Sequence, residues 1–279
     1  MRLRILASLL PLLVITVGRS PAQQTSDPKQ AELAVSARLK TMTQTDLQAL
    51  MVKAQAGDAE AECLMGRVYE EGRLVTKDEE EAARWFLKSA EEGYAPAQRL
   101  YGFMSVHINP SVGERWMLRA AEQGDAETQF WLGYAYENNW FGPTDPQEAL
   151  KWYKRAAESG DPDAQAELGQ RYEYGEGVEQ NYKLAAEWYR KAAQHVPNLG
   201  GAGQGSNQLG LLYMQGLGVP QDYVQAYFWC SLNGHDANAA EAKSHLSPSQ
   251  IREAERLLKE WKEQHRLKPE VAAALHIEN

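Results

Sequence analysis

The residues best suited to chemistry in this 279-residue chain are six histidines and two cysteines. The histidines lie at positions 107, 195, 235, 245, 265 and 276, and no two of them form a His-x-x-x-His or His-Glu-x-x-His pattern. Zinc sites in proteins are built from ligands at such short spacings. We therefore expect no metal site and no bound cofactor.

Of two other sequence patterns typical of phosphate-binding or catalytic sites, one is incomplete and the other is absent. Residues 200–206 are rich in glycine, but no strand pattern precedes them and no lysine follows the glycines, as a phosphate-binding loop requires. The chain also lacks a Gly-x-Ser-x-Gly sequence, which positions a nucleophilic serine in many hydrolases. We expect no catalytic residues and interpret residues 195–206 as an inserted loop.

The overall charge argues against a nucleic-acid partner. The chain has 29 Lys and Arg residues and 38 Asp and Glu residues, which gives a net charge of −9. Proteins that bind phosphate backbones need clustered cations. Hydrophobic residues make up 43% of the chain and charged residues 24%, which is typical of a globular protein.

The N-terminus has the pattern of a secretory signal peptide over residues 1–22. Arg2 and Arg4 precede an apolar stretch at 5–17, and Ser20 and Ala22 place small residues before the expected cleavage point. This pattern predicts an exported protein, periplasmic or extracellular, with no membrane span after cleavage. The alternative is an uncleaved N-terminal anchor.

The rest of the chain contains an internal repeat, which indicates that it is built from similar units. Five glycines recur at 66, 102, 133, 169 and 210, and five tryptophans recur in register with them at 85, 116, 152, 188 and 229. The basic period is 36 residues, shortened by five in the second unit and lengthened by five before the fifth. Periods of this size are typical of solenoids.

Each unit is predicted to contain two helices. The first carries the glycine, and the second begins at an Asp or Asn that lies seven residues before the tryptophan. These predicted N-cap residues are Asp78, Asn109, Asp145, Asn181 and Asp222. Glu81, Glu148 and Gln225 are predicted to complete capping boxes with three of them. We interpret the five repeat tryptophans as core residues.

Residues 149–160, together with Gly175-x-Gly177-Val178, resemble Sel1-like repeats, which are related to tetratricopeptide repeats. The resemblance covers about residues 46–246. It implies an all-α fold, a right-handed α/α superhelical solenoid of about five helix-pair repeats with capping helices. We divide the chain into a signal peptide (1–22), a flexible lead-in (23–43), the solenoid (44–246), a C-terminal capping helix (247–268) and a tail (269–279).

The resemblance implies a non-enzymatic scaffold or adaptor of the cell envelope that binds a peptide or protein segment on the concave face. An alternative is a cell-wall or β-lactam-related hydrolase or small-ligand binder, because some exported Sel1-like proteins with paired cysteines are associated with β-lactams. Here Cys63 and Cys230 lie in the first and fifth units, too far apart for a disulfide. We expect both to be free, buried thiols.

If the first helices line the concave face, their outward positions lie three before, one after, and four or five after each glycine. These positions are the predicted partner-binding residues, namely Arg99, Phe103, Phe130, Tyr134, Glu137, Gln170, Glu173, Tyr174, Asn207, Leu211 and Met214. We expect Phe103, Phe130, Tyr134 and Tyr174 to form the floor of a peptide-binding groove. Two alternatives remain: Phe130 and Tyr134 could complete the packing between repeats, or the inserted loop at 195–206 could bind the partner.

Overall fold

A computed structural model describes residues 28–195, 201–232 and 236–265, and within these residues the chain is helical with no strand. The described helices are α1 (Pro28–Thr41), α2 (Gln44–Gln55), α3 (Ala59–Glu71), α4 (Glu79–Glu91), α5 (Ala95–Val106), α6 (Pro110–Glu122), α7 (Ala126–Glu137), α8 (Pro146–Glu158), α9 (Pro162–Tyr174), α10 (Tyr182–Ala193), α11 (Gly201–Gln215), α12 (Tyr223–Ser231), α13 (Asp236–Ser244) and α14 (Pro248–Gln264). The predicted all-α solenoid of helix-pair repeats is confirmed. The signal peptide, the tail at 269–279 and residues 196–200 of the expected inserted loop lie outside the described residues. The expectation of a loop over 195–206 is wrong for residues 201–206, which form the start of α11.

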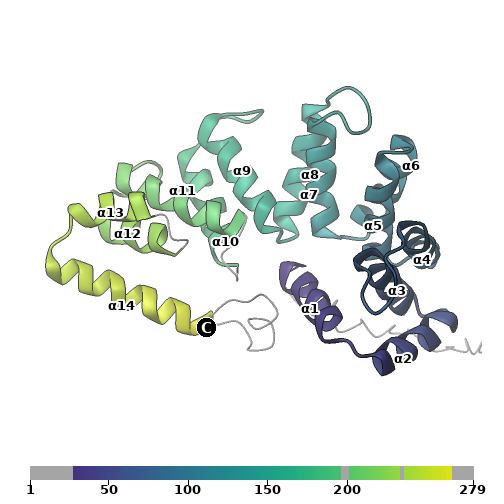
Figure 1. Cartoon of the computed structure of the whole chain (residues 1–279). Helices are drawn as coiled ribbons and strands as arrows, with labels where there is room; N and C mark the ends of the chain where they lie inside the picture. Colours follow the sequence, from purple (N-terminus) through teal and green to yellow (C-terminus); the bar gives the residue numbers. More distant parts are fainter. Residues whose placement is uncertain (1–27, 196–200, 233–235, 266–279) are drawn as a thin grey trace, which may run out of the picture.

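The first helices of the five repeats are α3, α5, α7, α9 and α11, and the second helices are α4, α6, α8, α10 and α12. Neighbouring helices pack against one another in chain order. In Figure 1 the pairs follow an arc from α2 and α3 through α7 and α8 to α11–α13, and α1 and α14 lie below the arc.

Polar N-caps begin every second helix, as the sequence predicts. Asp145, for example, accepts a hydrogen bond at Oδ1 from the backbone N–H of Glu148 at 3.0 Å, and equivalent bonds form at Asp78, Asn109, Asn181 and Asp222. Such a cap satisfies one of the amide groups that the first turn leaves without a helical partner.

The three predicted capping boxes do not form, so that part of the prediction is wrong. The side chains that should bond back to the N-cap are engaged further along their own helices. Glu81 pairs with Arg84, Glu148 pairs with Lys151, and Gln225 accepts from the indole N–H of Trp229. Capping boxes occur instead at Thr43 before α2 and Ser247 before α14.

Each helix pair is held together by a side chain that packs on the glycine of the first helix. That side chain is the residue directly after each repeat tryptophan: Phe86, Met117, Tyr153, Tyr189 and Cys230, all at most 1% exposed. An added Cβ at Gly169 would lie 2.6 Å from Tyr189 Cδ1. The glycine is therefore needed because the second helix approaches its backbone closely.

Three of the five repeat tryptophans are buried as predicted, and the other two are only partly buried. Trp116, Trp152 and Trp229 are buried, with 7%, 3% and 8% exposed, which confirms them as core residues. Trp85 and Trp188 are only partly buried. The indole rings of the first four units each lie beneath a basic side chain three residues later, as in Arg155 over Trp152 at 4.6 Å.

The N-terminal end differs from the expected flexible lead-in at 23–43, because Pro28–Thr41 forms helix α1. Leu39 and Met42 are buried in one core with Leu47, Leu50 and Leu64. The guanidinium of Arg73 also donates to the backbone carbonyls of Leu39 and Lys40 at the end of α1. These contacts attach the segment to the solenoid, which the weak patterning of its sequence does not indicate.

Candidate functional site

The predicted partner-binding residues lie on four of the five first helices, α5, α7, α9 and α11. We call the solvent-exposed side chains of the five first helices the first-helix surface. Tyr134 and Tyr174 are the most open of the predicted set, with 38% and 56% exposed. Seven further residues are partly exposed, namely Phe103, Phe130, Glu137, Gln170, Glu173, Asn207 and Leu211. Whether any of them contacts a partner stays a prediction.

Arg99 and Met214 are each only 8% exposed, so the expectation that they face outward is wrong. Arg99 extends toward the next repeat, where its guanidinium pairs with Glu127 at 3.0 Å. Met214 packs in a cluster with Ala226 and Ala242. The flank of the helix that carries these two positions is turned toward the neighbouring repeat and not toward solvent.

An aromatic cluster stands out on this surface in the second and third units. It consists of Phe103, Phe130, Trp131, Tyr134 and Trp140. The Trp131 ring is its centre, with ring centroids 5.5 Å from Phe103, 5.5 Å from Phe130 and 5.6 Å from Tyr134. Trp131 also stacks on Trp140 at 6.1 Å, with an angle of 18° between the ring planes. Every ring of the cluster is partly or largely open to solvent.

The structure thus joins three of the four residues expected to form a groove floor. Phe103, Phe130 and Tyr134 meet through Trp131, whereas Tyr174 makes none of these ring contacts. Phe130 also packs on Tyr153 of α8 at 5.7 Å, so it contributes to packing as well.

Sequence reasoning missed Trp131 and Trp140, the two rings that hold the cluster together. Trp131 lies two residues before the repeat glycine, and Trp140 lies in the connection between α7 and α8. A signal was available, because both tryptophans lie outside the register of the five repeat tryptophans. A tryptophan that the repeat does not explain is a candidate for surface function.

Glu137 and Glu173 are engaged within the solenoid. The hydroxyl of Tyr153 donates to Glu137 at 3.1 Å, and the hydroxyl of Tyr189 donates to Glu173 at 2.6 Å. Burial, together with these carboxylates, raises the pKa of both tyrosines far above its usual value. The tyrosines therefore stay neutral and act as hydrogen-bond donors that tie first and second helices together.

A buried arginine links the third and fourth repeats. Arg171 is 5% exposed and pairs with Glu137 at 2.7 Å and with Glu167 at 3.0 Å. Burial raises the pKa of Glu167, although the nearby guanidinium opposes this rise. The Arg171 guanidinium also lies 4.9 Å from the centroid of the Tyr153 ring. Because Phe130 of the aromatic cluster packs on that same ring, the charged residues lie next to the aromatic cluster.

Neither Cys63 nor Cys230 forms a disulfide, and both are buried, as predicted. Burial raises the pKa of the Cys230 thiol to about 11, which disfavours the nucleophilic thiolate. Among the residues that the structure describes, no group of three or more His, Cys, Asp or Glu side chains could hold a metal ion.

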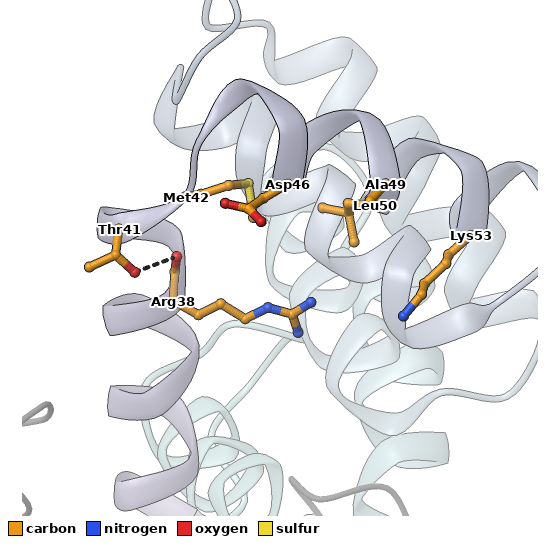
Figure 2. A pocket seen from close by; sticks show the side chains of 7 residues that line it. All are labelled: Arg38, Thr41, Met42, Asp46, Ala49, Leu50 and Lys53. Carbon is orange, nitrogen blue, oxygen red and sulfur yellow. Dashed lines mark hydrogen bonds between the residues drawn. The ribbon is translucent and has the colours of Figure 1, made fainter.

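A pocket of about 320 Å³ lies between α1 and α2 and is separate from the aromatic cluster (Figure 2). It is lined by Arg38, Thr41, Met42, Asp46, Ala49, Leu50 and Lys53. Asp46 is engaged in the N-cap of α2, where it accepts from the backbone N–H and the hydroxyl of Thr43, and these bonds lower its pKa. None of the predicted partner-binding residues lines this pocket.

Within the described ranges, no helix has the length and apolar composition needed to cross a bilayer. A comparison with curated protein sequences finds none that matches this chain.

Several solved structures are similar to this chain. A Sel1 repeat protein from Oxalobacter formigenes is 23% identical, with a TM-score of 0.64 over 85% of this chain and 67% of that one. The protective antigen c5321 of uropathogenic Escherichia coli is 24% identical, with a TM-score of 0.45 over 91% of this chain and 64% of its own. The immunity protein PA5088 of Pseudomonas aeruginosa is 19% identical, with a TM-score of 0.48 over 91% of this chain and 90% of its own.

A family model for the Sel1 repeat matches residues 59–94, 97–125, 126–161, 162–195 and 204–232. The first, third and fourth matches contain a complete pair of first and second helices, the second begins at residue 97 within α5, and the last spans α11 and α12 from residue 204. These five matches cover more than half of the chain and agree with the unit boundaries of the structure. The chain therefore belongs to the Sel1 repeat family.

Proposed function

We propose that this chain is a non-enzymatic scaffold or adaptor of the cell envelope, which binds a peptide or protein segment on the concave face of its solenoid. Sel1 repeat proteins are generally scaffolds for protein–protein interaction and are typically non-catalytic. The finer parts of the proposal, namely the concave face and the cell envelope, rest on features of this chain.

The observation that carries the binding proposal is the solvent-accessible aromatic cluster on the first-helix surface. Large aromatic side chains in a folded protein are normally buried, and those left open to solvent as a group are typical of binding surfaces. Phe103, Trp131 and Trp140 pack with one side against the buried core that contains Met117 and Leu132, and they remain partly exposed. The aromatic cluster is thus the solvent-accessible edge of that core.

The packing of first helices supports their placement on the inner side of the curve. The first helices α9 and α11 contact each other directly, and Gln204 of α11 donates to Gln170 of α9 at 3.1 Å. In a curved stack of helix pairs, the helices on the inner side approach one another most closely.

Photo-crosslinking tests the proposed site. A photoreactive phenylalanine analogue replaces Tyr134 or Tyr174 on the first-helix surface, and in control variants it replaces the exposed Arg115 of α6 or Glu187 of α10. In envelope extract we expect crosslinks from positions 134 and 174 and none from the controls. Crosslinks from the controls alone would place the partner on the second helices, and the concave-face proposal would then be wrong.

The envelope part of the proposal rests on residues 1–22, whose pattern is that of a signal peptide. We expect the mature chain to begin at Gln23 and to be found outside the cytoplasm. Intact-mass measurement of the protein from cell fractions tests this. A soluble chain in the cytoplasm with residues 1–22 retained would contradict export, and a membrane-bound chain with them retained would support the anchor alternative.

A further inference from the structure

We propose that the aromatic cluster binds an arginine or lysine side chain of a cationic protein segment. This inference rests on the proposed scaffold function and deepens it, because it names the chemistry of the partner. Two features of the solenoid support it: the excess of acidic residues on the first helices, and the rings of Trp131, Trp140 and Tyr134, over which no cationic side chain of the described residues lies.

Charge differs between the two kinds of helix. The five first helices carry nine acidic and three basic residues, whereas the five second helices carry nine acidic and ten basic residues. The first-helix surface is therefore acidic and the opposite side is nearly neutral. A surface of one charge sign attracts segments of the opposite sign and disfavours segments of its own sign.

Each of the three basic residues of the first helices is paired with a carboxylate on the same set of helices, and the first helices still carry six more acidic than basic residues. Arg67 pairs with Glu70 at 3.3 Å. The other two are the buried arginines described above, Arg99 with Glu127 and Arg171 with Glu137 and Glu167. The side chains of Arg99 and Arg171 are only 9% and 6% exposed, too enclosed to bind an anionic partner.

This solenoid already pairs tryptophan with cations in four repeats. Lys88, Arg119, Arg155 and Lys191 each lie over the tryptophan three residues earlier in the same second helix, between 3.7 and 5.5 Å from the ring centroid. The residues three after Trp131 and Trp140 are Tyr134 and Pro143. In the part of the chain that the structure describes, no cationic side chain lies over Trp131, Trp140 or Tyr134.

The geometry of the cluster suits a cation with an aliphatic stem. Trp131 and Trp140 lie almost parallel, and Tyr134 meets both rings edge-on at an angle of 77°. Glu127 lies one helical turn before Trp131 and Glu137 lies three residues after Tyr134, but these carboxylates already pair with Arg99 and Arg171. A ligand cation is therefore attracted by the faces of the rings and by the net negative charge of the first helices, whereas an acidic side chain would be repelled.

The test is a selection of random displayed peptides on the immobilised full chain, followed by the affinity of the enriched peptides. We expect enrichment of Arg and Lys, with affinity that falls between about 0.05 M and about 0.5 M salt because the charges are screened. Changing Trp131 and Trp140 together to Leu keeps apolar surface but removes the ring faces. This double variant should bind the enriched peptides about tenfold more weakly.

Trp261→Leu is the matched control, because Trp261 is also a partly exposed tryptophan outside the repeat register but lies on α14. It should bind like the unchanged chain, and circular dichroism checks that all variants are folded. Enriched peptides that need Trp131 and Trp140 but carry no excess of Arg or Lys would overturn the cation proposal and leave the scaffold function standing. Enriched peptides indifferent to the double change would overturn the site. If no peptides were enriched, the proposed function itself would fail.

Discussion

A single buried carboxylate distinguishes the first repeat from the others. In the second, third and fourth repeats, a glutamine four residues before the glycine donates its side-chain amide to a backbone carbonyl at the end of the preceding helix. These bonds join Gln98 to Ala90, Gln129 to Ala121 and Gln165 to Ala157, at 3.1, 2.9 and 3.1 Å. The first repeat has Glu62 at this position, with 0% exposed, and an ionised carboxylate has no proton to donate.

Lys88 of α4 takes over the role of that missing amide. Its ammonium lies 2.8 Å from Glu62 Oε1 and 3.4 Å from the carbonyl oxygen of Ala54, the position equivalent to Ala90 in the next repeat. Lys88 is half exposed, so it can reach water while it neutralises the buried charge. The ion pair thus substitutes for a neutral hydrogen bond.

The first prediction concerns this pair. Lys88→Met should lower the free energy of unfolding by about 3 kcal/mol, the lower end of the cost of leaving a buried charge unpaired. In a Glu62→Gln background, the new amide can donate to Ala54, and the same Lys88→Met change should cost less than about 1 kcal/mol. Urea unfolding of the four proteins measures the difference. Equal costs in the two backgrounds would show that Lys88 does not compensate Glu62.

Leu74 is a second residue that departs from the repeat, and its backbone has a positive φ. The turns after α9 and α11 place two glycines in the left-handed region, Gly175 and Gly177, and Gly216 and Gly218. The equivalent turn of the first repeat has Gly72 followed by Leu74, and Leu74 adopts φ 61°. Leucine is strained in this region because its Cβ approaches the backbone.

Leu74→Gly should therefore raise the free energy of unfolding by roughly 0.5 kcal/mol. The relief of left-handed strain is worth about 1 to 2 kcal/mol, and the greater freedom of glycine in the unfolded chain offsets about 0.4 to 1 kcal/mol of it. Leu74 is 41% exposed, so little burial is lost. Leu74→Ala is the control, because it shortens the side chain but keeps the strain, and thermal unfolding should show no gain. A gain of the same size for both variants would rule out strain as the cause.

At the scale of the element, the pairing of two helices depends on one glycine and one ring. In the fourth repeat, the Tyr189 ring covers Gly169, and its hydroxyl is fixed by Glu173 at 2.6 Å. Gly169→Ala favours the helix by about 1 kcal/mol, but the ring cannot move aside without losing that bond. Overpacking costs about 1 to 3 kcal/mol, so we expect net destabilisation.

Thermal unfolding of Gly169→Ala in two backgrounds measures this. In the unchanged chain the melting temperature should fall, and in a Tyr189→Leu background the added methyl group should cost less, because the ring is gone. A rise in melting temperature in the unchanged chain would mean that α10 does not pack on Gly169 as the structure shows.

The elements also show how far the sequence could predict the fold. The repeat register predicted the helix pairs, and the Asp and Asn residues predicted where the second helices begin, because these signals are local. Two errors arose where neighbouring positions on a helix differ by about 100° of rotation. The side chain that packs on the repeat glycine is the one directly after the tryptophan. On the first helices, Arg99, three residues before its glycine, is buried, whereas Trp131, two residues before its glycine, is partly exposed. Periodicity identifies a helix face but does not distinguish adjacent residues at its edge.

At the scale of the whole molecule, the two ends of the solenoid were predicted unequally. Helix α14 has a strong apolar stripe and a capping box at Ser247, so it could be predicted from the sequence. Helix α1 has neither and is held by contacts distant in the chain, such as those of Arg73 with its last carbonyls. Long-range contacts of this kind leave no local pattern in the sequence.

The role of α14 as a cap leads to the last prediction. Leu257, Leu258 and Trp261 of α14 pack on the core that contains Phe228 and Trp229 of α12. Covering each such side chain contributes about 1.5 kcal/mol, the lower end of the range for apolar burial, because the three remain partly exposed.

A chain that ends at residue 246 would expose this core at the end of the stack, where repeat proteins need a polar outer face to stay soluble. We expect it to melt at a lower temperature and to associate, as measured by light scattering. A chain that ends at residue 265 keeps α14 and should remain as stable and as dispersed as the full chain. If the chain ending at 246 behaved like this control, α14 would not be a cap, and the fifth repeat would close the solenoid by itself.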